Sequence, residues 1–87
     1  MKRQTWRIVV TDHTKPNDVP VAELVAYAKN SAIRLSEKAM GDIARDNHEY
    51  LYGANPESGP GFYTRSWANL NTNNPTILDV TITKDED

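Results

Sequence analysis

The residues best suited to chemistry are two histidines with neighbouring carboxylates. Asp12 and His13 follow a predicted strand, whereas Asp46, His48 and Glu49 lie in a predicted helical region. Such side chains bind zinc, but a helix-borne site needs ligands that recur on one face, and positions 48 and 49 differ by about 100° around a helix. No second histidine follows His48 at the i+4 spacing. The pattern therefore predicts exposed surface and no metal site.

Nucleophilic and phosphate-binding chemistry also lack their usual sequence signals. No serine lies in a strained, glycine-flanked turn, and the chain contains no cysteine. Gly59 and Gly61 precede a predicted strand, whereas a phosphate loop precedes a helix and includes a lysine. We therefore expect no catalytic residues, no cofactor and no enzymatic activity.

Composition favours one small domain with a protein partner. The chain has 87 residues, and ten Lys and Arg against twelve Asp and Glu give a net charge of −2, without the basic excess of a nucleic-acid binder. A domain of this size buries only about 60–65% of its unfolded surface, so association would add stability. No apolar run approaches the roughly 20 residues that span a membrane. We expect a protein partner, no membrane partner and, in the absence of cysteine, an intracellular or assembly-bound protein.

The hydrophobic pattern of the first half predicts a strand followed by a long helix. The side chains of residues 4–11 alternate between two faces, as those of a strand do. In residues 20–51 the apolar side chains recur at the helical spacings of three, four and seven residues. Pro20 suits the first turn of a helix. A continuous helix of this length would measure about 45–50 Å, so we expect a break or kink near Gly41.

The second half predicts a loop and a hairpin. Residues 53–61 contain three of the four glycines and two of the five prolines, which predicts a mobile loop. Residues 62–83 read as two strands joined by the turn sequence "NTNNP". Residues 1–87 are thus predicted to form a single α+β domain of order β-α-β-β, in which the helix packs on a three-stranded, mostly antiparallel sheet.

The strand that begins at residue 62 has an unusual aromatic content. Tyr63, Arg65 and Trp67 lie two residues apart and so share one face. Trp, Tyr and Arg are enriched where proteins bind one another. Aromatic side chains also stack on single-stranded nucleic acid, but that mode needs a basic groove, and only Arg65 is local. The predicted interface comprises Phe62, Tyr63, Arg65, Ser66 and Trp67.

The stretch "GPGFYTRSW" at residues 59–67 follows a helical region and a glycine-rich loop. This order of elements resembles that of the small tail-completion and head–tail joining proteins of long-tailed bacteriophages. In that family the loop leads into a strand with the motif "T-G-x-L-R-x-S-[IW]". Gly61, Arg65, Ser66 and Trp67 match its glycine, basic, serine and bulky apolar positions. The family usually has a threonine just before its glycine, where this chain has a proline.

The resemblance implies a structural protein that forms a ring with copies of itself or with other virion proteins. It also implies a location in the host cytoplasm during assembly and afterwards in the virion. Two other classes fit the same sequence. A small phage- or plasmid-encoded inhibitor of a host protein would be a monomer or dimer, and a nucleic-acid-binding module would combine the Tyr63 face with Lys2, Arg3 and Arg7.

Overall fold

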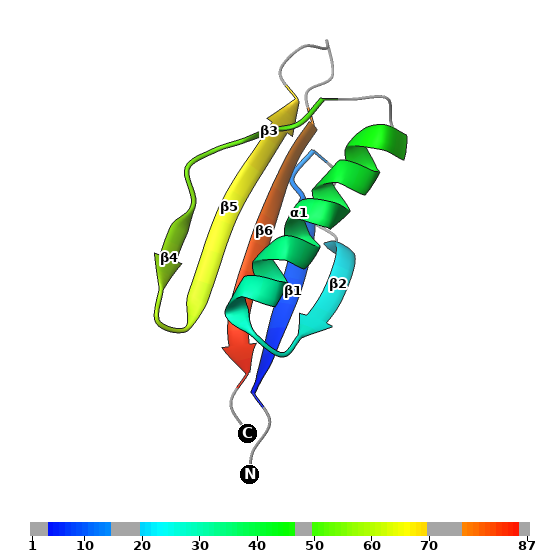
Figure 1. The fold of residues 1–87 in the computed structure, drawn as a ribbon. Helices are drawn as coiled ribbons and strands as arrows, with labels where there is room; N and C mark the ends of the chain where they lie inside the picture. Colours follow the sequence, from blue (N-terminus) through cyan, green and yellow to red (C-terminus); the bar gives the residue numbers. More distant parts are fainter. Residues whose placement is uncertain (1–3, 15–19, 47–49, 70–75, 86–87) are drawn as a thin grey trace.

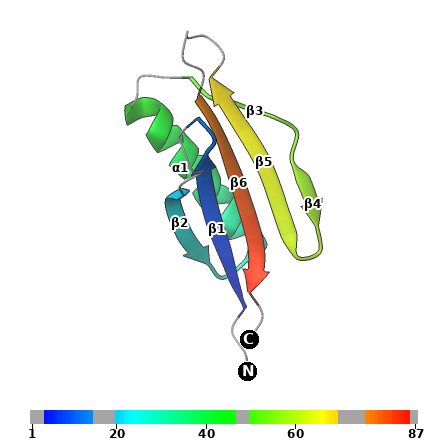
Figure 2. The same ribbon diagram turned by 180° about the vertical axis from the view of Figure 1, so that it is seen from behind.

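One helix packs on one face of an antiparallel sheet in the computed structural model (Figures 1 and 2). The structure describes residues 4–14, 20–46, 50–69 and 76–85. The α+β class predicted from the sequence is confirmed. The elements are β1 (Thr5–Asp12), β2 (Pro20–Ala26), α1 (Lys29–Asp46), β3 (Tyr52–Gly53), β4 (Glu57–Gly59), β5 (Phe62–Asn69) and β6 (Thr76–Asp85).

The described residues form a six-stranded sheet, so the prediction of three strands in the order β-α-β-β is wrong. Its order is β2-β1-β6-β5-β3, and β4 also pairs with β5. All these pairs are antiparallel, as expected. The hairpin predicted for residues 62–83 is confirmed, because β5 and β6 pair from Phe62 opposite Thr83 to Asn69 opposite Thr76. The two ends of the chain thus supply the central strands β1 and β6.

The helical region predicted for residues 20–51 is wrong at its start, where β2 forms instead. Val21, Leu24 and Val25 satisfy both helical spacing and strand alternation, so the pattern alone does not decide between them. Pairing decides the conformation, because β1 offers a free edge on which Leu24 lies opposite Ile8. Pro20 is the first residue of this strand, where a missing N–H is tolerated.

The helix α1 spans 18 residues and continues through Gly41 without a break. It is about 27 Å long, so the predicted kink is not needed to keep the domain small. Ala32, Ser36 and Met40 lie one turn apart and are buried against the sheet. The buried Ser36 hydroxyl donates to the Ile33 carbonyl at 2.6 Å, which satisfies it within the helix. Among the described residues, no helix is long and apolar enough to cross a membrane.

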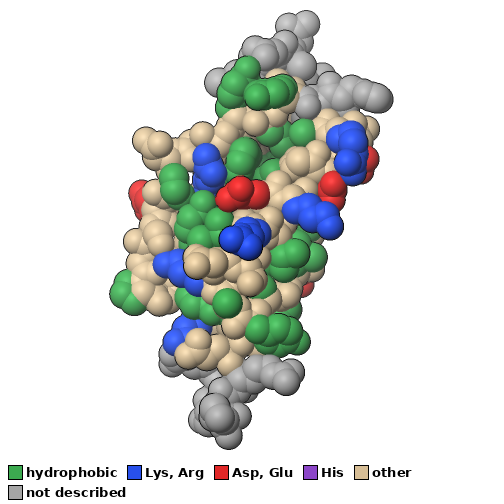
Figure 3. All heavy atoms as spheres, in the orientation of Figure 1, with side chains coloured by type: hydrophobic (Ala, Val, Ile, Leu, Met, Phe, Trp, Pro, Cys, Tyr) green, Lys and Arg blue, Asp and Glu red, His purple; other side chains and the backbone are tan. Residues whose placement is uncertain are grey.

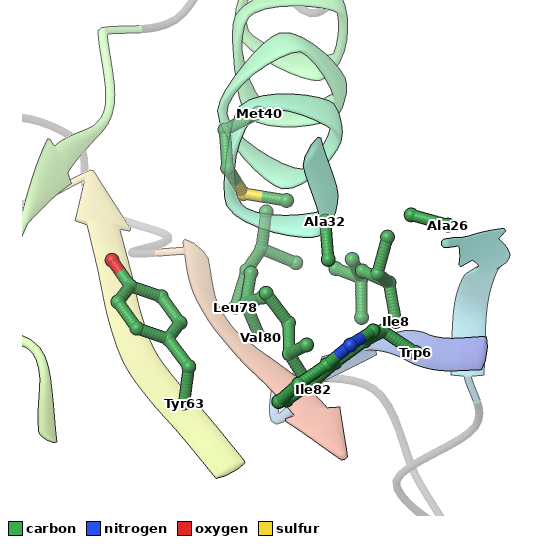
Figure 4. Close-up of a cluster of buried hydrophobic side chains, with 10 residues drawn as sticks. Trp6, Ile8, Ala26, Ala32, Met40, Tyr63, Leu78, Val80 and Ile82 are labelled. Carbon is green, nitrogen blue, oxygen red and sulfur yellow. The ribbon is translucent and has the colours of Figure 1, made fainter. Parts of the chain in front are cut away.

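The core lies between α1 and the central strands (Figure 4), and none of the described elements covers the opposite face of the sheet (Figure 2). Alternate residues of β1 and β6 point toward the helix because successive side chains of a strand point to opposite faces. The buried hydrophobic residues are Trp6, Ile8, Val10, Ala26, Ala32, Met40, Tyr63, Leu78, Val80 and Ile82.

Residues 53–61, predicted to be a loop, include β4 and the end of β3. Both strands pair with β5. The Lys29 ammonium, at the start of α1, donates to the Ser58 hydroxyl at 2.7 Å and to the Gly59 carbonyl at 2.8 Å. The helix and the β4–β5 hairpin are therefore linked by one side chain.

Candidate functional site

The helix covers only part of the sheet face on which it lies. It packs chiefly on β1, β2 and β6, and β5 lies to one side of it (Figure 1). Tyr63, Arg65 and Trp67 lie opposite Ile82, Val80 and Leu78, which places all three on the helix side of the sheet. Tyr63 is buried in the core, whereas Trp67 is only partly buried. The boundary between core and solvent therefore runs along β5.

A pocket of about 320 Å³ lies at this boundary, between α1 and β5. Figure 3 looks onto this face. It shows hydrophobic side chains beside α1, with charged side chains among and around them. The buried Met40 is part of its wall, and the small residues Gly41 and Ala44 leave its helix side open. We call this site the Trp67 hollow; it is lined by Glu37, Met40, Gly41, Ala44, Tyr50, Leu51 and Trp67.

The rim of the Trp67 hollow is aromatic. Tyr50 is 68% exposed, and its ring centroid lies 4.9 Å from that of Tyr52, which is also exposed. Leu51, between them in the chain, packs against the core. Rings that support one another lose little freedom when a partner covers them.

Arg65 is held in a fixed position beside Trp67. Its Nε donates to the Ala54 carbonyl at 2.8 Å, and its Cζ lies 4.4 Å from the centroid of the Trp67 ring. The guanidinium lies against the backbone of Gly53, where a Cβ atom would come within 2.5 Å of Nη2. Gly53 therefore provides the space in which Arg65 lies.

A polar cluster lies on the opposite, open face of the sheet. The Ser66 hydroxyl donates to Asp79 Oδ1 at 2.6 Å, and His13 Nε2 bonds to Asp79 Oδ2. These are the residue types of a hydrolytic triad, but in a triad the histidine stands between serine and aspartate. Here the carboxylate stands in the middle, so His13 is not placed to take a proton from Ser66.

A polar pocket of about 310 Å³ lies beside this cluster, and its lining includes Ser66 and Asp79 together with Glu57 and Arg65. Within the described ranges, no group of three His, Asp or Glu side chains is placed to hold a metal ion. Asp12 accepts from the backbone N–H and hydroxyl of Thr14 in a local turn. His48 and Glu49 lie outside the described residues.

The five predicted interface residues do not form one surface. Strand alternation places Tyr63, Arg65 and Trp67 on the helix side and Phe62 and Ser66 on the open side. The Phe62 ring lies over Gly59, its partner at the end of β4.

Sequence reasoning missed the helix wall and the tyrosine rim of the Trp67 hollow. Met40 and Ala44 are spaced as one helix face, which is visible in the sequence. Their position beside Trp67 depends on long-range packing, for which the sequence has no local signal.

The basic and aromatic side chains that could together bind nucleic acid lie on opposite faces of the sheet. Arg7 lies opposite Val25 and Thr83 on the open side, where its Nε is 3.6 Å from an Asp85 carboxylate oxygen. Trp67 lies on the helix side. Arg7 therefore does not add charge to the Trp67 face, and Lys2 and Arg3 lie outside the described residues.

No protein-family model, characterised protein or solved structure matches this chain. Its function must therefore be inferred from the geometry of its own side chains. Among the described residues, the hollow offers apolar and aromatic surface with the Glu37 side chain in its lining, and Arg65 contacts Trp67 beside it. This arrangement is suited to binding.

Proposed function

We propose that this chain is a non-enzymatic structural protein that acts by binding other proteins through the Trp67 hollow. One observation supports the proposal above all others: the helix leaves β5 uncovered where Trp67, Leu51 and Tyr50 meet. A domain this small gains stability from every apolar side chain that it buries. Leaving these residues accessible is more easily explained when a partner covers them.

The chemistry of the hollow fits a protein partner. Trp, Tyr and Arg dominate the binding energy of many protein interfaces, particularly around a well-packed pocket. Arg65 is already oriented by Ala54 and Trp67, so binding would cost little of its side-chain entropy. A partner with an apolar side chain for the hollow and an acidic group for Arg65 would satisfy both features.

The resemblance to phage tail-completion and head–tail joining proteins suggests the particular role of a virion subunit. Gly61, Arg65, Ser66 and Trp67 belong to the β5 hairpin that borders the hollow. In a ring, the hollow of one subunit would receive a different patch of the next, because a head-to-tail contact joins two different surfaces. The ring closes when the rotation between neighbouring subunits adds up to a full turn.

An inhibitor of a host protein is the second candidate. The same hollow would then receive a segment of that host protein, and the chain would act as a monomer or dimer. The position of Arg65 and the tyrosine rim favour the inhibitor as much as the virion subunit, since both reduce the entropy lost on binding any partner.

Affinity capture from cells of the native source, with chemical cross-linking, tests the proposal. The wild-type chain should capture a specific protein that Trp67→Ala does not, whereas Ile77→Ala should retain it. Ile77 is a matched control, because it is an exposed apolar residue on the open face. Capture of virion proteins would support the virion role, capture of a host protein would support the inhibitor, and equal capture by Trp67→Ala would refute the site.

A further inference from the structure

Two opposite charges border the Trp67 hollow. Glu37 belongs to its helix wall, and Arg65 lies against Trp67 on its β5 wall, with Cζ 4.4 Å from the ring centroid. The helix α1 and the strand β5 run in the same direction (Figure 1), and each charged residue precedes the apolar residues of its wall. The pairing of β3 with β5 places Tyr50 and Leu51 beyond Trp67. The two charges therefore lie at one end of the hollow, and the aromatic rim lies at the other.

Neither charge is neutralised within the part of the chain that the structure describes. No ion pair there includes Glu37 or Arg65, although the two residues lie beside the same hollow. Glu37 is exposed and accepts no hydrogen bond from a described residue. Arg65 uses its Nε for the Ala54 carbonyl, and its two Nη groups have no acceptor among the described residues. A partner thus meets one available carboxylate and one available guanidinium edge.

We propose that the segment bound in the hollow presents an apolar side chain between one basic and one acidic side chain, the basic one toward Glu37 and the acidic one toward Arg65. The inference rests on the proposed function, because it specifies the partner of the same hollow. A guanidinium edge with two Nη groups matches the two oxygens of a carboxylate. A lysine or arginine beside Glu37 supplies the opposite charge there. A segment with these charges exchanged would bring like charges together at both positions, which is unfavourable.

The stacking of Arg65 on Trp67 decides which charge belongs on the β5 side. An aromatic ring attracts cations over its face, but here the Arg65 guanidinium occupies one face of the Trp67 ring. The guanidinium repels a second cation on this side, whereas it attracts a carboxylate. The hydrogen bond to Ala54 holds the guanidinium in place, so little side-chain entropy is lost when a carboxylate binds. The basic side chain therefore belongs on the helix side, where Glu37 lines the hollow.

Selection from a displayed library of random peptides tests this charge pattern before the partner is identified. The library is selected on the purified wild-type chain and on Trp67→Ala, and the peptides that only the wild-type chain enriches are sequenced. These peptides should contain an apolar residue with an acidic residue on one side and a basic residue on the other. An exposed ion pair commonly changes affinity by about two- to fivefold, so each charge should be enriched over its opposite by a factor of that order.

Charge reversal at Glu37 is the main comparison. Glu37→Lys should exchange the preferred basic residue for an acidic one and leave the acidic residue for Arg65 unchanged, so its peptides should carry two acidic residues. Because Glu37 is exposed, the variant should fold as the wild-type chain does. Glu23→Lys is the matched control, since it changes the net charge equally, but Glu23 is exposed on β2 and lies opposite Val9 on the open face. Arg65→Gln should remove the preference for an acidic residue and retain that for a basic one.

Titration calorimetry with a synthesised wild-type peptide measures each dissociation constant, and circular dichroism checks each fold. Glu37→Lys should bind this peptide about tenfold more weakly, since an attraction becomes a repulsion, and Glu23→Lys should bind it as the wild-type chain does. Equal charge preferences for the wild-type chain and Glu37→Lys would overturn the inference, while weak binding by Trp67→Ala would still support the hollow as the site. A library that yields no Trp67-dependent peptide would also overturn the inference, and affinity capture from the native source would still decide the proposed function.

Discussion

The guanidinium of Arg65 lies over the indole ring of Trp67, with its Cζ 4.4 Å from the ring centroid. The two residues are next-but-one neighbours on β5, so both point to the helix side of the sheet. The Ala54 carbonyl fixes the other end of the contact by accepting from Arg65 Nε. Two segments of the sequence, β5 and the residues around Ala54, thus combine to orient the side chains beside the hollow.

Replacing Arg65 should show that its shape matters as well as its charge. Arg65→Ala should lower the free energy of unfolding by about 1–2 kcal/mol, because it removes a hydrogen bond to Ala54 and a cation–π contact with Trp67. Arg65→Lys should recover only a minor part of this loss, since an ammonium lacks the planar face and the Nε donor. Urea unfolding of the three proteins measures both effects. A lysine variant as stable as wild type would contradict the described geometry.

Gly53→Ala should disturb Arg65 specifically. The new methyl group would meet the guanidinium, which moves at a small cost of about 0.5–1 kcal/mol because it is the end of a flexible side chain. In an Arg65→Ala background this cost should vanish. A double-mutant cycle measures the coupling between the two sites, and additive effects would show that they do not touch.

The hairpin of β5 and β6 was predictable from the sequence, because alternation and turn residues are local signals. The β2 segment was not, since Val21, Leu24 and Val25 fit a helix and a strand equally well. Its conformation depends on pairing with β1, which the hydrophobic pattern within residues 20–26 does not reveal. β3 and β4 are too short for a periodic signal of their own.

The candidate site was predictable only in part, for a related reason. The shared face of Tyr63, Arg65 and Trp67 follows from strand periodicity alone. Their burial does not follow from periodicity, because it depends on where α1 lies. Tyr63 is a core residue, whereas Trp67 lines a pocket beside α1. The pairing of Ser66 with Asp79 is a matter of hairpin register, which the turn sequence leaves open.

Gly41→Ala should stabilise the protein. Gly41 is exposed within α1, and a Cβ atom there would meet nothing within 4 Å. Alanine restricts the unfolded chain and favours the helix by about 0.5–1 kcal/mol. Thermal unfolding should therefore show a higher midpoint for Gly41→Ala and a lower one for Gly53→Ala. A lower midpoint for Gly41→Ala would mean that this part of the helix is strained or covered.

Ser66 should be inert toward reagents that label nucleophilic serines. Its hydroxyl donates to Asp79, a weak base, and His13 bonds to the far oxygen of the same carboxylate, so the imidazole is not placed to take the Ser66 proton. Incubation with a fluorophosphonate should leave the mass of the chain unchanged, while a serine hydrolase in the same tube is labelled. Labelling that Ser66→Ala abolishes would reopen an enzymatic interpretation.

Trp67→Ala should damage partner binding more than His13→Ala or substitutions at His48 and Glu49. Truncating an interface tryptophan commonly costs about 2–4 kcal/mol of binding, whereas exposed polar changes usually stay within about 0.5 kcal/mol. Because Trp67 also packs against the core, circular dichroism and urea unfolding must first show that the variant is folded.

Trp67→Phe separates stability from binding at the same position, since it keeps an aromatic ring in the hollow and removes only part of the contact area. Binding should fall in the order wild type, Trp67→Phe, Trp67→Ala, with folded fractions that remain close to one. Titration of the captured partner against each variant measures the order. If Trp67→Ala folds and binds as wild type does, while His13→Ala abolishes a measurable activity, the open face of the sheet is the functional surface and the hollow is not.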